Sequence, residues 1–210
     1  MPETIKKTSF YERYWDGDKE VLSDFDLKWP VLSEYIPKDK EIKLLDFGCG
    51  KGHILSQIVR LNSSAMLRGC DVSETALDVA RTKVPTGEFY KIVDGGPIPL
   101  ADSSVDFVFS SEVVEHIYDT ENAIREIARV LKPGGMFLIT VPYHGFLKNL
   151  SIVFLGFDKH FDPTGPHIRF FSKKTLTTLL KKNGLEIENY NYYGRFFPFS
   201  HSIVAFAKKK

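Results

Sequence analysis

The motif that organises this chain spans nine residues and reads Leu44-Leu45-Asp46-Phe47-Gly48-Cys49-Gly50-Lys51-Gly52. It begins inside a short apolar run, residues 43–47, which predicts a buried strand. Glycines at positions 48, 50 and 52 follow directly, and glycine lets a backbone pass where a Cβ would collide with a ligand. A helical spacing of apolar residues begins at once over residues 53–61. Strand, glycine turn and helix in this order predict a ligand site at the end of the strand.

The alternation of strand and helix continues along the chain. Ser73 is the predicted N-cap of a second helix, and Lys132-Pro133-Gly134-Gly135 predicts a helix stop and a turn. Further strands are predicted at 65–70, 88–93, 105–110, 136–141, 186–192 and 202–207, and further helices at 121–131 and 173–182. Strand and helix alternate five times, which predicts an α/β fold with a parallel sheet and helices on both faces. Ligands of such sheets bind at the carboxyl ends of the strands.

The composition limits the classes of protein that fit. The chain has 210 residues, which suits one domain over residues 1–210. Twenty-eight basic and 27 acidic residues leave a formal net charge of +1, so no nucleic-acid partner is expected. The two cysteines fall in no zinc spacing and the N-terminus lacks the apolar core of a signal peptide, so we expect a cytoplasmic location. The oligomeric state is left open.

Carboxylates lie at the ends of the first three predicted strands: Asp46 and Asp71 end the first two, and Asp94 follows the third. At the position of Asp71, a carboxylate can take both hydroxyls of a ribose. Asp46 can fix the loop or accept a hydrogen bond from a ligand amine, and Asp94 can receive an adenine amino group. The alternative is that Asp71 and Asp94 cap the turns in which they lie. The third glycine comes one residue earlier than in the dinucleotide fingerprint, which disfavours a nicotinamide cofactor.

Several segments, in this order along the chain, resemble the class I S-adenosyl-L-methionine (SAM)-dependent methyltransferases, of the ubiquinone-biosynthesis and type 11 groups. They are residues 44–52, 70–73, 93–95, 99–100, 103–108 and 131–135. The resemblance implies a Rossmann-like, seven-stranded, mostly parallel sheet whose last two strands form an antiparallel edge hairpin. It implies that Val72 packs on the adenine and that Gly95 and Ser111 offer backbone groups to the cofactor. The expected cofactor-binding set is Asp46, Gly48, Cys49, Gly50, Gly52, Asp71, Val72, Asp94, Gly95 and Ser111.

A cluster of acidic residues and histidine follows the fourth predicted strand. Glu112, Glu115 and His116 are spaced i, i+3 and i+4, so a helix would place all three on one face. The string resembles a Glu-x-x-Glu-His motif of ubiquinone-biosynthesis and small-RNA 2′-O-methyltransferases, and His167 lies where the latter carry a further histidine. By this resemblance the four residues are candidate ligands of Mg²⁺ or Mn²⁺, with Zn²⁺ harder to exclude. His116, His167 and Glu115 are also the candidate catalytic residues. The alternative is that His116 shapes an acceptor pocket without a metal.

Two further regions are expected to cover the site. Residues 1–40, rich in aromatic rings, resemble the N-terminal lid of these enzymes, although a helix packed on the sheet explains the rings equally well. Lys28 lies where the ubiquinone-type enzymes carry a cofactor-contacting arginine. Residues 142–172 form a long acceptor-side insertion with apolar residues at helical spacing over 146–157. This helix is expected to be a lid, or alternatively an interfacial helix that contacts a membrane surface.

The favoured function is therefore O-methylation of a small-molecule hydroxyl, with SAM as the methyl donor. Methylation of a lipid-like quinol at a membrane surface is one alternative. Another is a non-catalytic SAM-binding protein that acts through a partner, for which the Glu112, Glu115, His116 and His167 cluster would be unnecessary. An RNA methyltransferase is disfavoured by the near-neutral charge, and a dehydrogenase by the glycine spacing.

Overall fold

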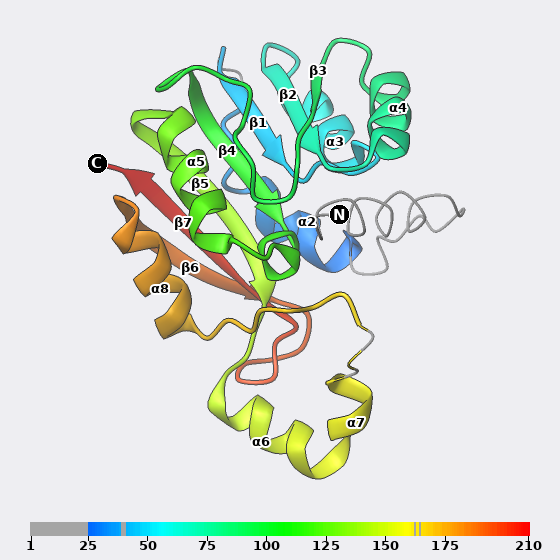
Figure 1. Ribbon diagram of the computed structural model, residues 1–210, viewed down its shortest axis with the longest axis vertical. Coiled ribbons are helices and arrows are strands. Elements are labelled where there is room, and N and C mark those ends of the chain that lie inside the picture. The colour runs from blue at the N-terminus through cyan, green and yellow to red at the C-terminus, as the bar shows by residue number, and fades with distance from the viewer. Residues whose placement is uncertain (1–24, 39–40, 162, 164) are drawn as a thin grey trace, which may run out of the picture.

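The computed structural model describes residues 25–38, 41–161, 163 and 165–210, which contain one seven-stranded sheet (Figure 1). The strand order is β3-β2-β1-β4-β5-β7-β6. Their bounds are β1 Lys43–Phe47, β2 Met66–Asp71, β3 Glu88–Lys91, β4 Val105–Ser111, β5 Leu131–Pro142, β6 Leu185–Tyr193 and β7 Ser202–Lys209. The first five strands are parallel, whereas β7 pairs antiparallel with both β5 and β6. The predicted fold, including the antiparallel edge hairpin, is confirmed.

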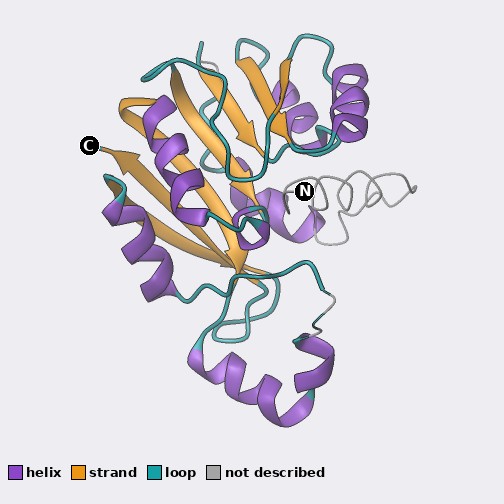
Figure 2. Cartoon of the chain, in the orientation of Figure 1, coloured by secondary structure: helices purple, strands orange, loops and turns teal. Residues whose placement is uncertain are grey.

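Helices cover both faces of this sheet (Figure 2). They are α2 Phe25–Ser33, α3 His53–Leu61, α4 Glu74–Lys83, the 3-10 turn η1 Val114–His116, α5 Thr120–Val130, α6 Phe146–Leu155, α7 Phe157–His160 and α8 Lys173–Lys182. Adjacent residues of β1 supply two separate cores because successive strand side chains point to opposite faces. Leu44 packs in the core that holds α2, α3 and α4, and Leu45 packs in the core that holds α5 and α8. The sheet is therefore buried on both sides.

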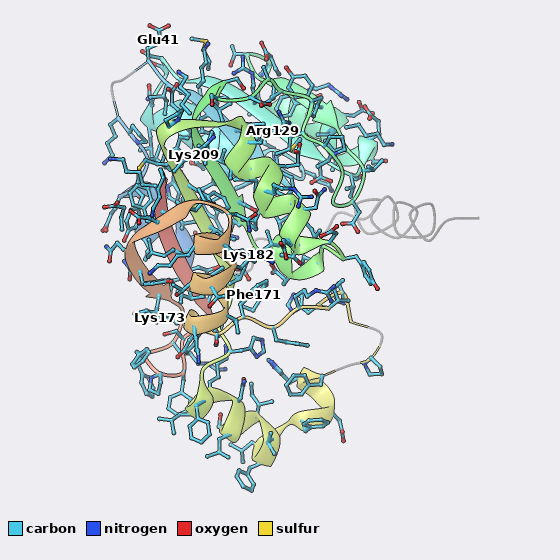
Figure 3. The ribbon with its side chains drawn as sticks, turned by 60° about the vertical axis from the view of Figure 1, so that its left-hand side comes forward. Glu41, Arg129, Phe171, Lys173, Lys182 and Lys209 are labelled. Carbon is cyan, nitrogen blue, oxygen red and sulfur yellow. The ribbon has the colours of Figure 1, made fainter. Side chains whose placement is uncertain are left out.

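Local capping groups begin the helices where the sequence predicts them. The Ser73 side chain accepts a hydrogen bond from Ala76 N at 3.2 Å and caps α4, as expected. Ser172 and Thr175 form a reciprocal capping box at the start of α8. Lys182, at the other end of α8, forms an ion pair with Glu121 of α5, and Figure 3 shows this end of α8 beside α5. These contacts fix the two helices on their shared face of the sheet.

The predicted turn at Lys132–Gly135 lies inside a strand instead. β5 already starts at Leu131, which pairs with Val105, and pairing resumes with Met136 opposite Phe107. Only Asp106 of β4 lies opposite the four residues 132–135 of β5, so the turn is an irregularity in the pairing of these two strands. Gly134 has a φ of 76°, as a turn requires. The sequence signal for a turn was right, but strand pairing on both sides makes the segment part of β5.

The insertion at residues 142–172 projects from the end of the sheet and carries α6 and α7 (Figure 1). No residue of α6 is buried, and α6 packs chiefly on α7 among the described elements. The helix predicted over 146–157 is present as α6, which ends at Leu155, and its role as a lid over the acceptor pocket stays a prediction. Within the described part of the chain, no helix combines the length and the apolar character needed to cross a bilayer.

Candidate active site

The glycine loop after β1 turns on three glycines with left-handed backbone. Gly48, Gly50 and Gly52 have φ values of 78°, 50° and 69°, a region that L side chains rarely adopt. A Cβ on Gly48 would lie 2.4 Å from Val113 Cγ2, and a Cβ on Gly52 would lie 2.9 Å from Ala80 Cβ. Backbone conformation and protein packing thus already require glycine at these two positions. The sequence argument, that a ligand must approach closely, is not needed to explain them.

Asp71 holds this loop from the end of β2. Its Oδ2 accepts a hydrogen bond from Gly50 N at 2.9 Å, and its Oδ1 accepts one from Ser73 N at 2.9 Å. The side chain is buried, so the carboxylate braces the loop and the following turn together. A carboxylate oxygen can accept a further hydrogen bond, which leaves capacity for a ligand hydroxyl. The two roles proposed from the sequence, turn cap and ribose acceptor, are therefore compatible.

Asp46 is buried directly beneath the loop, and its pKa is raised to about 8. Burial is the largest cause, the negative charge of Asp71 adds to it, and the charge of Lys28 opposes it. Lys28 is itself buried and reaches this region from α2. Two buried carboxyl groups thus lie close enough to repel each other, and the charge of Lys28 partly compensates at Asp46. A cation bound here would favour ionised Asp46, so this pair of carboxyl groups fits a cofactor that carries a sulfonium and an amine.

The other expected cofactor residues surround the same edge of the sheet. Cys49 is buried in the loop, and burial raises the pKa of its thiol, which makes it an unreactive filler of the loop. Val72 follows β2 and packs on the core. Gly95 has a φ of 64°, and its carbonyl accepts a hydrogen bond from the Asn122 side chain. Asp94 is half-buried next to it, and Ser111 ends β4. The structure therefore gathers the predicted set at the carboxyl ends of β1 to β4.

Glu112 does not share a helix face with Glu115 and His116, contrary to the sequence expectation. Its φ of 55° is left-handed, so the chain turns sharply before η1 begins at Val114. Its Oε1 accepts hydrogen bonds from Thr140 Oγ1 at 2.8 Å and from the Tyr193 hydroxyl at 3.0 Å. Neither partner was anticipated, because both come from strands distant in the sequence. The group of possible ligands that the structure brings together omits Glu112.

That group consists of Glu115, His116 and His167, each offering one ligand atom within 4.8 Å of the others. Glu115 is fully buried, and its two carboxylate oxygens have no hydrogen-bond partner among the described residues. Burial, followed by the charge of Glu112, raises its pKa. His116 Nε2 lies 3.7 Å from Glu115 Oε1. A buried carboxylate without a hydrogen-bond partner next to a histidine nitrogen fits a cation, a proton or a ligand hydroxyl between them.

Backbone contacts bring His167 to this group from the insertion. The Glu115 carbonyl accepts hydrogen bonds from Ile168 N and Arg169 N, both at 3.0 Å. Pro166 O lies 3.0 Å from His116 Nδ1, and a carbonyl only accepts, so Nδ1 carries the proton of the neutral ring. His116 Nε2 is then the unprotonated nitrogen of the ring, on the side of Glu115. This arrangement, with the second ring nitrogen on a carbonyl, is the one that histidine ligands of metals adopt.

The N-terminal lid predicted for residues 1–40 falls largely outside the described residues. Of its aromatic residues, Phe25, Trp29 and Tyr35 are described. Trp29 stacks on Phe25 with ring centroids 5.6 Å apart and packs against the core. Phe25 also contacts His53, at the start of α3, with ring centroids 4.8 Å apart. The described end of this region therefore packs beside the glycine loop. The prediction for residues 1–24 stays a prediction.

Comparisons with known proteins agree with this geometry. A family model described as a methyltransferase domain, Methyltransf_11, matches residues 45–139. The chain is 29% identical to the ubiquinone biosynthesis O-methyltransferase of Pelagibacter ubique, over 89% of this chain and 84% of that protein. It is also 29% identical to the biotin biosynthesis bifunctional protein BioHC of Cellvibrio japonicus, over 83% of this chain. The chain spans only 35% of the length of BioHC.

Solved structures show the same fold. A SAM-dependent methyltransferase from Aquifex aeolicus superposes with a TM-score of 0.70 at 20% identity, covering 97% of this chain and 98% of that one. The family match includes the glycine loop, Asp71 and the Glu115–His116 pair described above. The chain therefore belongs to the class I S-adenosyl-L-methionine-dependent methyltransferases.

Proposed function

We propose that this protein transfers a methyl group from SAM to a hydroxyl group of a small-molecule acceptor. The observation that carries the proposal is the group of Glu115, His116 and His167, which a protein that only binds SAM would not need. This group lies near the glycine loop, because Val113, two residues before Glu115, packs directly on Gly48. An acceptor held by this group would therefore lie next to the cofactor.

The carboxyl groups at the strand ends are assigned to the cofactor. Asp71 is assigned to the ribose hydroxyls, Asp46 to the positive charge of the methionine part, and Asp94 to the adenine. Val72, Gly95 and Ser111 keep the roles that the family resemblance implies. The sulfonium supplies an electrophilic methyl group when SAM is bound, so the chain has only to align the acceptor, exclude water and accept the hydroxyl proton.

Two routes can remove that proton. In the first, His116 Nε2 takes it directly as a general base, since the proton of the neutral ring is on Nδ1. In the second, Glu115, His116 and His167 would hold Mg²⁺ or Mn²⁺, which would lower the pKa of an acceptor hydroxyl. Treatment with EDTA followed by return of Mn²⁺ separates the routes. Activity that survives chelation excludes the metal route, and activity lost and restored by Mn²⁺ supports it.

The test of the proposed function uses His116→Ala with a panel of phenolic and catecholic acceptors. We expect the variant to lose methyl transfer and to keep its affinity for SAM in calorimetry, since His116 lies outside the glycine loop. Wild-type protein that binds SAM but methylates none of the acceptors would favour the non-catalytic alternative. Wild-type protein that binds neither SAM nor S-adenosylhomocysteine would contradict the proposal entirely.

The exposed face of α6 favours a second candidate, methylation of a lipid-like acceptor at a membrane surface. Phe146, Phe154 and Leu155 are 80%, 77% and 86% exposed. Two polar side chains of the helix turn inward. Lys148 Nζ donates a hydrogen bond to Ser200 O at 2.9 Å, and Asn149 Oδ1 accepts one from His144 Nδ1 at 3.1 Å. A helix with its apolar residues outward is suited to an apolar environment such as a membrane surface.

Sedimentation with anionic liposomes tests this second candidate. We expect wild-type protein to co-sediment, and Phe154→Ser combined with Leu155→Ser to remain in the supernatant. Val79→Ser, an exposed apolar change on α4, is the matched control and should bind like wild type. Wild-type protein that stays in the supernatant would exclude the membrane role while leaving methyl transfer untouched. A cytoplasmic location remains part of the proposal, and the two buried free cysteines suit a reducing compartment.

A further inference from the structure

Glu112 is held in place by groups from other strands of the sheet. Its Oε1 accepts hydrogen bonds from Thr140 on β5, at 2.8 Å, and from Tyr193 at the end of β6, at 3.0 Å. Its backbone N–H donates to the Thr140 carbonyl at 3.0 Å. The Thr140 hydroxyl also lies 3.0 Å from the Ser111 hydroxyl, which extends the network to the end of β4. Side chain and backbone of Glu112 are thus both attached to the sheet.

The backbone conformation of Glu112 needs such an attachment. Glu112 and Ser103 are the two non-glycine residues with positive φ among those that the structure describes. Glutamate has no local preference for this region, unlike asparagine or glycine, so tertiary contacts must hold it there. Strained backbone of this kind gathers at functional sites. Hydrogen bonds from the side chains of Thr140 and Tyr193, together with one from Ser202, are contacts that can hold it.

The turn at Glu112 sets the position of both halves of the site. The next residue, Val113, places its methyl groups where a Cβ on Gly48 would be, so it packs against the cofactor loop. The Val113 carbonyl then accepts a hydrogen bond from His116 N at 3.0 Å, which starts η1 and aims Glu115 and His116 into the site. The four residues 113–116 therefore connect the glycine loop to the proton-accepting group. A change in the turn would move both together.

We propose that Glu112 is a positioning residue, which fixes the Glu115–His116 group against the glycine loop through its hydrogen bonds to Thr140 and Tyr193. The inference rests on the proposed methyl transfer, because it assigns Glu112 a part in that reaction. It replaces the role of metal ligand that the sequence spacing gave to Glu112. A ligand role needs the negative charge, whereas a positioning role needs an oxygen that accepts two hydrogen bonds.

Glu112→Gln and Glu112→Ala separate these roles. Glutamine keeps the size and offers a carbonyl oxygen to Thr140 and Tyr193, but it lacks the charge of a carboxylate ligand. We expect Glu112→Ala to lower kcat about 100-fold by misplacing the cluster, and Glu112→Gln to stay within about 10-fold of wild type. Tyr193→Phe should give an intermediate loss, and Tyr192→Phe, whose hydroxyl is not bonded to Glu112, is its matched control.

A second readout does not depend on turnover. The imidazole proton signals of His116 and His167 in NMR spectra report the geometry of the cluster. We expect these signals to shift in Glu112→Ala and in Tyr193→Phe, and to stay near the wild-type positions in Glu112→Gln. If wild-type protein methylates none of the acceptors, this readout still tests the positioning role. Should Glu112→Ala not fold, Tyr193→Phe carries the same comparison.

Two outcomes overturn the inference. Loss of activity in Glu112→Gln equal to that in Glu112→Ala would show that the charge is needed. Histidine signals that are unchanged in both Tyr193→Phe and Glu112→Ala would show that Glu112 does not position the cluster. Rescue by glutamine together with shifted signals in Tyr193→Phe supports it.

Discussion

The buried carboxyl group of Asp46 should make SAM binding depend on pH, and the substitution Asp46→Asn should remove that dependence. Its pKa is raised from an ordinary value of 3.8 to about 8, chiefly by burial and secondly by Asp71. At neutral pH the ligand-free protein therefore holds a proton on Asp46. A bound cation favours the ionised form, so binding should release that proton. Asp46→Asn mimics the protonated group at every pH and cannot release one.

The magnitude follows from the size of the shift. One pKa unit corresponds to about 1.4 kcal/mol, so a rise from 3.8 to about 8 is a destabilisation of about 6 kcal/mol at high pH. The sign is fixed because the folded chain keeps a proton that the unfolded chain has already lost. The free energy of unfolding of the ligand-free protein therefore falls between roughly pH 4 and pH 8 and levels off above. Because binding releases one proton, SAM affinity should rise by up to about tenfold for each unit by which the pH increases, until it reaches about 8.

Calorimetry of SAM binding at pH 6.0, 6.5, 7.0 and 7.5 measures this dependence. The affinities of wild type and Asp46→Asn should converge at pH 6.0 and separate as the pH rises. The difference between the two proteins cancels the titration of the ligand itself. Asp78→Asn, a change of an exposed carboxylate on α4, should follow wild type. An Asp46→Asn variant with the wild-type pH slope would refute the reasoning, because the proton would then come from another group.

Three further predictions test the glycine loop, the hydrogen bonds of Arg129 and the Glu115–His116 group. Gly52→Ala should destabilise the fold by about 1–3 kcal/mol in urea titrations, because its φ is left-handed and its Cβ would lie 2.9 Å from Ala80 Cβ; an unchanged midpoint would contradict this. Arg129→Lys should lower the free energy of unfolding by about 2 kcal/mol, since one lysine cannot replace the guanidinium bonds to Ile98 O, Leu100 O, Asp102 and Glu126 (Figure 3); a loss below about 0.5 kcal/mol would argue against it. Glu115→Gln should abolish methyl transfer and, by removing a buried carboxyl group, keep or raise the melting temperature; a lowered temperature with activity retained would show a structural role instead.

Local patterns in the sequence were sufficient for the elements that make up most of the fold. The bounds predicted for β1, α3 and α8 are those observed, because apolar periodicity and flanking glycines or caps mark each end. The segment at Lys132–Gly135 shows the limit of this reasoning. Its turn residues are local signals, whereas membership of β5 depends on pairing with Val105 and Phe107 of another strand. Strand pairing is a property of the assembled sheet.

The meeting of the residues assigned to the cofactor at one edge of the sheet was predictable for a related reason. Parallel strands bring their carboxyl ends to one edge, so residues that follow β1 to β4 must meet there once the order of elements is known. The acceptor side was not predictable from spacing alone. An i, i+3, i+4 pattern implies a shared face only on a helix, and Glu112 has left-handed backbone before the helical turn begins. Hydroxyl groups 28 and 81 residues away hold it there.

The same distinction applies to α6, where the pattern predicted a helix but not which side of it would face the protein. Amphipathic spacing fixes the angle between apolar and polar residues around a helix, and the inward face then follows only if the outside is water. In α6 the inward contacts are made by Lys148 and Asn149, with Phe154 and Leu155 outward. Burial lowers the pKa of Lys148 to about 8, so its inward position costs free energy in water. Burial of Phe154 and Leu155 in an apolar phase would offset that cost. Liposome binding, with its α4 control, is therefore the measurement that tests whether the acceptor is reached from a membrane.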